Sequence, residues 1–393
     1  MKVALVIKTA DGGRWTLPHV DELRERGHDV VAVLPPGSEG QLRKALHDRG
    51  VDVVQSAFDF RFRPGPATLR GLLGLRRQLR GLDPDVVHYH LYASALACRL
   101  AALGLHAARV HMVPGPLFLE SPLIRAVERL LCRLDDVTIG GSEHVARRYR
   151  ELGLTEERTP AIPYGVDVEQ FAPPSAAYRA ASRDALCAGD DTFVVCMVAY
   201  VYAPKRLVRP GRGVKGHDVL LSAWREFTRD RPDARLVLLG GGFDAAGIAY
   251  KRQLLERFDV ATDHTVDWHD SVLDVRDCYA AADCSVSPSL SENHGAALEA
   301  AAMGVPSIVS DAGALPETLD PASGWVVPRD DPAALAGALR AAYADFRAGT
   351  LARRGELARE RAERLFAQRP AARAVADVLE RAARQRRGRR AGA

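Results

Sequence analysis

Hydrophobic positions along the chain fall into short, nearly continuous runs separated by longer segments with helical spacing. The spacing of Leu17–Arg26 and Tyr92–Leu103, for example, predicts amphipathic helices. Runs that are apolar at almost every position are typical of parallel strands covered on both faces. In the first half of the chain the predicted strands are Val3–Ile7, Val30–Leu34, Val51–Val54, Val86–Tyr89, Arg109–Val113 and Val137–Ile139. This alternation predicts a doubly wound α/β domain.

The pattern is interrupted once, at residues 162–174. This segment contains prolines and a glycine and has no helical periodicity. After this break the predicted strands are Phe193–Val198, Leu236–Leu239, Thr265–Trp268, Cys284–Ser287, Pro306–Val309 and Trp325–Val327. We therefore expect two Rossmann-like parallel-sheet domains, residues 1–165 and 166–368. A C-terminal helix and basic tail over 369–393 should return toward the first domain. Ligands of such sheets bind outside the carboxyl ends of the strands, which predicts a cleft between the domains.

Composition narrows the class of protein. The net charge of +4 over 393 residues gives no indication of nucleic acid as a partner. No apolar run approaches the roughly 20 residues that span a bilayer, and the first apolar run is a strand rather than a signal peptide. The six cysteines have no CxxC spacing, which is typical of reduced thiols. We expect a cytoplasmic protein, at most peripheral at the inner face of the membrane.

Residues 287–310 carry the most informative candidate chemistry. Glu292 follows a predicted strand, and Glu299 lies in the first turns of a helix predicted over Ala296–Met303. Backbone N–H groups at the start of a helix bind phosphate or hydroxyl oxygens without a metal, and a glycine lets the ligand approach closely. The candidate N–H groups are those of Asn293, His294, Gly295 and Ala296.

This segment resembles the donor-binding signature of GT-B glycosyltransferases of family 4, and residues 311–317 continue the match. Residues 11–13, 162–171 and 214–220 match other segments of that family in the same order, so the resemblance covers nearly the whole chain. It implies the GT-B fold and transfer of a hexose or N-acetylhexosamine with retention of configuration. The implied donor is a nucleotide diphosphate sugar, and no metal or cofactor is implied. We expect UDP as the base, with GDP as the alternative, because the sequence does not choose between them. The acceptor would be a glycan, a lipid-linked sugar or a specialised small molecule.

The resemblance also implies roles for single residues. Glu292 would bind a hydroxyl of the donor sugar at the reaction centre, and Glu299 would bind the ribose hydroxyls. Lys215 would neutralise the departing diphosphate. Gly12 and Gly13 would let the backbone of the first domain close over the phosphates. The nucleotide base would contact the backbone near residues 240–242 and 266–268, and the donor's own phosphate oxygen would take the acceptor proton.

The sequence departs from the family pattern at two places. The family has seven residues between the two carboxylates, whereas six separate Glu292 from Glu299. The usual Gly-Arg before the Lys-Gly is replaced by residues 199–200, Ala-Tyr, and a basic insertion follows. We expect Lys205 to replace the missing arginine, with Arg212 as the alternative.

Histidines of the first domain are further candidates. The family often places a histidine after a strand near the reacting carbon. His111 lies in such a strand, but Pro114 and Gly115 occupy the place of the usual His-Gly. His88 and His90 share one face near the carboxyl end of another strand. We take His90 and His111 as catalytic candidates, with a buried structural histidine as an equal alternative. Two histidines without a third ligand nearby do not define a metal site.

Two basic segments bear on membrane contact. Residues 60–80 mix arginines with apolar side chains, as in a helix that rests on a membrane surface or in an ordinary helix with one buried side. The arginine-rich tail from Arg381 predicts a frayed, solvated end, with weak attraction to anionic lipid as the alternative.

Other functions remain as alternatives. A nucleotide-sugar 2-epimerase has the same architecture, and a non-catalytic relative would keep only donor binding. A nicotinamide-dependent oxidoreductase is disfavoured because no GxGxxG follows the first strand and no acid ends the second. A metal-dependent GT-A transferase is disfavoured because the only Asp-x-Asp, residues 83–85, precedes a strand instead of following one.

Overall fold

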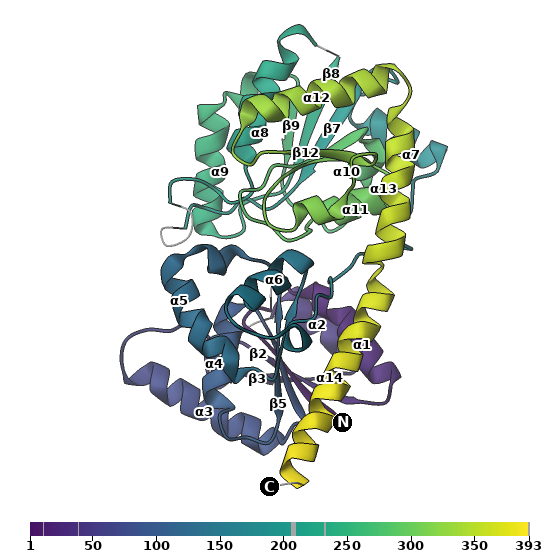
Figure 1. The fold of residues 1–393 in the computed structure, drawn as a ribbon. Helices are drawn as coiled ribbons and strands as arrows, with labels where there is room; N and C mark the ends of the chain where they lie inside the picture. Colours follow the sequence, from purple (N-terminus) through teal and green to yellow (C-terminus); the bar gives the residue numbers. More distant parts are fainter. Residues whose placement is uncertain (11, 38, 206–209, 232, 392–393) are drawn as a thin grey trace. The chain divides into compact units, whose positions relative to one another are not determined.

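The computed structural model describes residues 1–10, 12–37, 39–205, 210–231 and 233–391, which form two compact units (Figure 1). Unit 1 comprises Met1–Tyr164 together with the C-terminal segment that begins at Gln368. Unit 2 comprises Gly165–Ala367. Each unit is built on one parallel six-stranded sheet.

The sheet of unit 1 has the strand order β3-β2-β1-β4-β5-β6. Its strands are β1 (Lys2–Ile7), β2 (Asp29–Leu34), β3 (Asp52–Gln55), β4 (Val86–His90), β5 (Ala108–Val113) and β6 (Val137–Gly140). Val3 pairs with Val30 on β2 and with Val86 on β4. Chain order reverses between β1 and β4, so their carboxyl ends flank the position where ligands of doubly wound sheets bind. The strands predicted from the sequence are confirmed.

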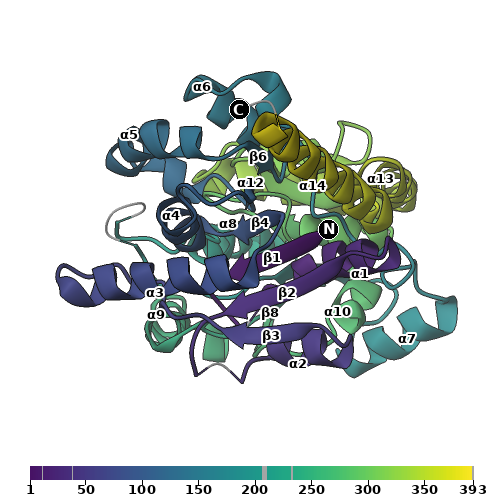
Figure 2. The same cartoon turned by 90° about the horizontal axis from the view of Figure 1, so that it is seen from below.

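Helices cover both faces of this sheet because successive side chains on each strand point to opposite sides. Leu5 packs on one face with α1, α2 and α14, and Ala4 and Val6 pack on the other with α3 and α4 (Figure 2). The helices of unit 1 are α1 (Leu17–Glu25), α2 (Gln41–Asp48), α3 (Pro66–Leu82), α4 (Tyr92–Ala101), α5 (Pro122–Leu131), α6 (Glu143–Glu151) and α14 (Gln368–Ala391).

The C-terminal tail differs from the sequence-based expectation. Instead of fraying at Arg381, the chain continues as helix α14 through Ala391. Leu379 is fully buried in the core of unit 1, and Arg387 Nη2 lies 2.5 Å from Asp85 Oδ1. Arg386, Arg387 and Arg389 form ion pairs with Asp85 and Asp136, which lie just before strands β4 and β6. These contacts hold in place a segment that looks solvated in the sequence.

Helix α3, which contains most of the basic and apolar stretch over residues 60–80, is only partly covered. Leu75 and Leu79 are fully buried in the core of unit 1. Leu69 and Leu73 are 61% and 45% exposed. One side of α3 is therefore packed against the core, as in an ordinary helix. Two apolar side chains on it, Leu69 and Leu73, remain exposed to solvent.

Unit 2 repeats the same topology with the order β12-β11-β10-β7-β8-β9, so chain order reverses between β7 and β10. Its strands are β7 (Phe193–Val198), β8 (Ala234–Leu239), β9 (Val266–His269), β10 (Cys284–Ser287), β11 (Ser307–Ser310) and β12 (Gly324–Val327). All of them lie where the sequence predicts strands.

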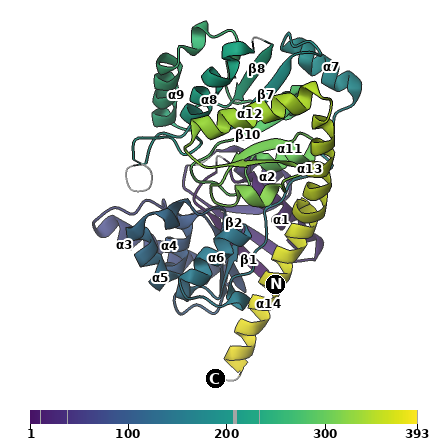
Figure 3. The same ribbon diagram turned by 45° about the horizontal axis from the view of Figure 1, so that its top comes forward.

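The helices of unit 2 are α7 (Ala176–Ala185), α8 (His217–Phe227), α9 (Ala245–Arg257), α10 (Arg276–Ala281), α11 (Ala297–Ala302), α12 (Pro332–Arg347) and α13 (Leu351–Phe366). One face of the sheet packs against α8, α9 and α12, and the other against α7, α10 and α11. Helix α13 packs on α11 (Figure 3). A search of the described helices finds none with the length and apolarity that a membrane crossing requires.

Candidate functional site

The candidate site of unit 2 is built from the two loops that leave β7 and β10. These strands are neighbours in the sheet, so the loops that follow them lie side by side. The Leu290 N–H donates to the Val214 carbonyl over 2.8 Å, which joins the loops. Gly216 has a φ of +72°, and a Cβ at this position would lie 2.1 Å from the Pro288 carbonyl oxygen. Only glycine satisfies both conditions, so Gly216 is required for the loops to approach.

This approach brings Lys215 and Glu292 together as an ion pair. Their side chains are 21% and 16% exposed, so both are largely withdrawn from water yet still accessible. Burial by itself would lower the pKa of Lys215, but the charge and hydrogen bond of Glu292 outweigh it and raise the pKa. The Asn293 N–H donates to Glu292 Oε1 over 3.1 Å. The pair therefore holds a cation and a carboxylate at the carboxyl edge of the sheet.

The turn between Glu292 and α11 supplies N–H groups. Among the described residues, the N–H groups of His294, Gly295 and Ala296 have no hydrogen-bond partner. Gly295 has a φ of +52°, and a Cβ there would lie 3.2 Å from the Glu292 carboxyl carbon. The turn at Gly295 thus packs tightly against Glu292. The N–H of Asn293, predicted for the ligand, donates to Glu292 instead.

The imidazole of His294 points into unit 2. It is buried against the Phe366 ring, and its Nε2 lies 3.4 Å from Glu317 Oε2. Of the groups that His294 contributes to the predicted site, only the backbone N–H is left for a ligand.

Glu299, in the first turn of α11, has an unusual environment. Burial raises its pKa to about 7, and a hydrogen bond with the Tyr279 hydroxyl opposes that rise. The Tyr279 oxygen lies 3.1 Å from Glu299 Oε2 and 3.2 Å from the Ala296 carbonyl oxygen. The Tyr279 hydroxyl is the donor in both contacts, so its one proton is shared between the Glu299 carboxyl group and the Ala296 carbonyl. Sequence reasoning missed Tyr279, because it lies on α10, outside the motif at residues 287–310.

The two candidates for the missing arginine have different surroundings. Arg212 is held by two carboxylates, with its Nε 2.7 Å from Asp218 Oδ2 and a second ion pair to Asp330. Lys205 Nζ lies 5.9 Å from the centroid of the Tyr202 ring. Arg212 therefore anchors its own loop, and Lys205 stays the residue predicted to contact a phosphate. The other two arginines of the basic insertion lie outside the described residues.

The expected base-binding segments are also close to one another. The Trp268 ring stacks on His217, with centroids 5.3 Å apart and planes 5° apart, and Trp268 Nε1 donates to the Gly240 carbonyl over 3.0 Å. Lys251 Nζ lies 5.3 Å above the Trp268 ring. Sequence reasoning found Trp268 but missed both of its ring partners.

In unit 1 the glycine pair follows β1. Gly12 and Gly13 have φ values of +83° and +77°, which side chains other than glycine rarely adopt. A Cβ at Gly13 would also lie 3.1 Å from Leu42 Cδ2. Asp11, the first residue of the matching segment, lies outside the described residues.

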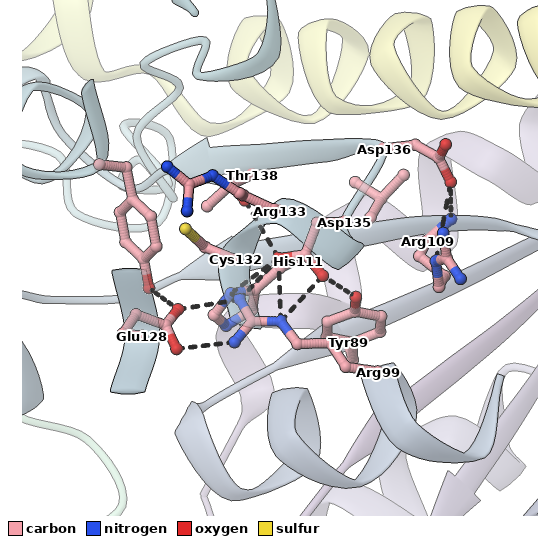
Figure 4. A network of polar contacts seen from close by, with 12 residues as sticks. Tyr89, Arg99, Arg109, His111, Glu128, Cys132, Arg133, Asp135, Asp136 and Thr138 are labelled. Atoms are coloured by element: carbon pink, nitrogen blue, oxygen red, sulfur yellow. Dashed lines mark hydrogen bonds and ion pairs between the residues drawn. The ribbon is translucent and has the colours of Figure 1, made fainter. Parts of the chain in front are cut away.

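His111 belongs to a buried polar network centred on Arg99 (Figure 4). Arg99 forms ion pairs of 2.7 Å with Glu128 and 2.6 Å with Asp135, and all three side chains are fully buried. His111 Nδ1 lies 3.2 Å from Arg99 Nη2. Burial and the Arg99 charge hold the pKa of His111 well below its usual value. Its neighbours are those of a structural residue, and its catalytic role stays a prediction.

Sequence reasoning missed this network because Arg99 lies on a helix whose pattern suggests a solvated arginine. His90, the other catalytic candidate, is also fully buried, with Nδ1 2.9 Å from the Tyr164 hydroxyl. Its role likewise stays a prediction.

The fold and the two-carboxylate loop are those of a class of protein, the GT-B glycosyltransferases, and comparison with known proteins supports this assignment. A family model described as Glycosyltransferase Family 4 matches residues 13–170, and one described as Glycosyl transferases group 1 matches residues 204–345. A D-inositol 3-phosphate glycosyltransferase of Xylanimonas cellulosilytica is 30% identical over 327 residues, 77% of this chain and 73% of that protein.

A second relative and two solved structures extend the comparison. A GDP-mannose-dependent monoacylated alpha-(1-6)-phosphatidylinositol monomannoside mannosyltransferase of Corynebacterium glutamicum is 30% identical over half of each chain. HepE of Anabaena, crystallised with UDP and glucose, superposes with a TM-score of 0.79 at 18% identity, over 97% of this chain and 99% of that chain. Sucrose-phosphate synthase of Thermosynechococcus elongatus gives 0.76 at 20% identity over 97% and 99%. The chain belongs to glycosyltransferase family 4 and has the GT-B fold.

Proposed function

We propose that this glycosyltransferase moves a hexose or N-acetylhexosamine from a UDP-sugar to an acceptor hydroxyl with retention of configuration. The observation that carries the proposal is the Lys215–Glu292 ion pair beside the N–H groups of His294, Gly295 and Ala296. A lysine, a carboxylate and an amide cluster at the carboxyl edge of a parallel sheet complement a sugar diphosphate.

The pair suggests how donor binding proceeds. Without a donor, Glu292 neutralises Lys215. A diphosphate carries more negative charge than one carboxylate, so it draws the Lys215 ammonium toward its oxygens. Glu292 is then released and accepts a hydrogen bond from a hydroxyl of the donor sugar. As the glycosidic bond breaks, Lys215 and the amide cluster stabilise the charge that develops on the diphosphate.

Glu299 is the proposed ligand of the ribose. An ionised carboxylate accepts hydrogen bonds from two hydroxyls, whereas a protonated one has to donate. Because the Glu299 pKa is raised to about 7, its ability to bind ribose depends on pH near neutrality.

Retention by front-face attack is supported by the surroundings of Glu292. Glycosidases that use a carboxylate nucleophile place a second carboxyl group about 5–5.5 Å away. The near partner of Glu292 is a lysine instead. We therefore propose that the donor's phosphate oxygen takes the acceptor proton and that no metal takes part in the transfer.

Different relatives suggest different donor bases, and one of them suggests an acceptor. HepE of Anabaena was crystallised with UDP-glucose, which supports UDP, whereas the Corynebacterium relative is named as GDP-mannose-dependent. The Xylanimonas relative suggests an inositol phosphate among the acceptors to be tried, beside glycans and lipid-linked sugars.

We also propose peripheral contact with a membrane through helix α3. This helix exposes two leucines, Leu69 and Leu73, beside two arginines, Arg70 and Arg77. Sedimentation with anionic vesicles tests the proposal.

The test has two stages. Thermal melting with UDP, GDP, ADP, dTDP and their sugar conjugates, in the presence of EDTA, should give a clear shift for UDP, since a ligand of the folded state raises the melting temperature. Mass spectrometry then follows sugar transfer to each acceptor. Product formed from the donor alone would indicate a 2-epimerase. Donor binding without any turnover would indicate a non-catalytic relative, and a shift with GDP alone would replace UDP as the donor base.

A further inference from the structure

Three imidazoles from two elements meet in the interior of unit 1. His19 lies on α1, and His88 and His90 lie near the end of β4. Each is at most 1% exposed, and one ring nitrogen from each lies within 4.8 Å of those of the other two. The sequence argument against a metal site considered only His88 and His90, because His19 is distant in the chain.

The Nδ1 atoms of His88 and His90 each take part in a hydrogen bond. His88 Nδ1 lies 3.2 Å from the Val110 carbonyl oxygen, which only accepts, so Nδ1 carries the proton. His90 Nδ1 lies 2.9 Å from the Tyr164 hydroxyl oxygen. In both rings Nε2 is therefore the nitrogen that is left for another ligand.

None of these Nε2 atoms has a protein donor. Among the described residues, Nε2 of His88, Nε2 of His90 and both ring nitrogens of His19 lack a hydrogen-bond partner. Buried ring nitrogens that lie together without a hydrogen-bond partner require a positively charged or polar occupant.

We propose that His19, His88 and His90 bind a transition-metal ion of the zinc class through three neutral imidazoles. Nitrogen ligands of a tetrahedral zinc ion lie about 3.4 Å apart, so small ring rotations within the 4.8 Å cluster bring all three onto one ion. Histidine ligands usually donate their other ring N–H to a carbonyl or a similar acceptor, as His88 does here. The fourth position would hold a water or another small ligand.

The position of the cluster indicates what the ion would do. His19 lies on α1, the helix that follows β1, and the other two ligands lie on β4. The ion would therefore link α1 to a central strand of the sheet. His90 would extend this link to Tyr164, the last residue of the first segment of unit 1. All three imidazoles are buried in the interior of unit 1, so the proposed ion is a structural element, and His90 as its ligand would not serve as a catalytic residue.

Metal content tests the proposal directly. The full-length chain, produced without a histidine tag and desalted after incubation with Zn²⁺, should retain about one zinc ion per chain. Co²⁺ loading should give the visible absorption of a tetrahedral nitrogen-ligated ion. Zn²⁺ at 100-fold excess over its Kd should raise the melting temperature of the stripped protein by about 5 °C.

Variants decide which residues are responsible. His19→Gln and His88→Gln should lose the retained ion and the zinc-dependent melting shift. The matched control is His217→Gln, a buried imidazole of unit 2, which should keep both. Should the His19 and His88 variants fail to fold, the cobalt spectrum of the wild-type chain still tests the site. Wild-type protein that retains no zinc and shows no melting shift would overturn the proposal in favour of a buried water that donates to the ring nitrogens.

Discussion

Lys215 and Glu292 are 77 positions apart in the sequence and form an ion pair at the point where chain order reverses in the sheet of unit 2. The pairing depends on the adjacency of β7 and β10 and on Gly216, which lets the two loops approach. It places a cation for a leaving diphosphate next to a carboxylate for a sugar hydroxyl.

Replacing Glu292 with alanine should slow sugar transfer. The change removes one or two charge-assisted hydrogen bonds, each contributing about 1.5–3 kcal/mol, which corresponds to about tenfold to a few hundredfold in kcat/KM per bond. The control is Glu226→Ala, which removes a surface carboxylate paired with Arg340 and should leave kcat/KM nearly unchanged. Wild-type turnover by Glu292→Ala would refute the assigned role.

The raised pKa of Glu299 predicts a pH-dependent stability. Its folded-state pKa of about 7 exceeds the ordinary value of 4.5, so the protonated carboxyl stabilises the fold below about pH 4.5. This contribution is lost as the pH rises to about 7. Glu299→Gln should therefore be more stable than wild type by about 2 kcal/mol at about pH 8 and similar to it at about pH 4. Urea unfolding across pH measures the difference, with Glu256→Gln, an exposed carboxyl of α9, as the control.

Ionisation of Glu299 should lower the stability of the fold but raise its affinity for the nucleotide. Ionised Glu299 accepts hydrogen bonds from the ribose, so UDP should bind more tightly as the pH rises from about 6 to about 8. Calorimetry should show this trend in the wild type and a flat profile in Glu299→Gln. Equal slopes in both proteins would exclude Glu299 as the ribose ligand.

Gly216→Ala should disrupt the junction of the two loops. A Cβ at Gly216 would lie 2.1 Å from a backbone carbonyl oxygen, so the loop that carries Lys215 has to move. Gly211→Ala is a matched control, since Gly211 has a φ of +84° but open space around it. Both variants incur backbone strain of about 1 kcal/mol. Only Gly216→Ala should also lose UDP binding, which thermal melting with and without UDP would reveal.

Lys205 and Arg212 can be separated by their effects on affinity and on stability. Lys205→Met should weaken UDP binding by about tenfold and leave uridine binding unchanged, because it removes one charge-assisted contact to a phosphate. Arg212→Met should mainly lower the melting temperature, because Asp218 and Asp330 lose their shared cation. A selective loss of UDP affinity in Arg212→Met, with no loss in Lys205→Met, would reverse the assignment.

Arg99→Met should destabilise unit 1. The change leaves Glu128 and Asp135 buried without their cation, and breaking a buried ion pair from one side typically costs about 3–5 kcal/mol. Arg148→Met, which removes a surface pair with Glu151, should cost less than about 1 kcal/mol. Urea unfolding of the two variants tests this, and equal midpoints would contradict a supporting role for the network.

The sequence by itself determined the strands and the donor-loop motif. Strands such as Phe193–Val198 are recognisable because a parallel strand covered on both faces has to be apolar at nearly every position. Glu292 and Glu299 are recognisable because both belong to one local strand–loop–helix unit, whose spacing is set by short-range geometry.

Only the tertiary structure decided which distant groups meet. Arg99 and Tyr279 are buried against carboxylates that come from other elements, and His19 reaches His88 and His90 only because α1 packs beside β4. These contacts leave no periodic trace in the chain, because a single polar residue in a helix has the same local pattern whether it faces water or an ion pair. The physical reason is that burial and charge pairing depend on the neighbours that the fold brings together.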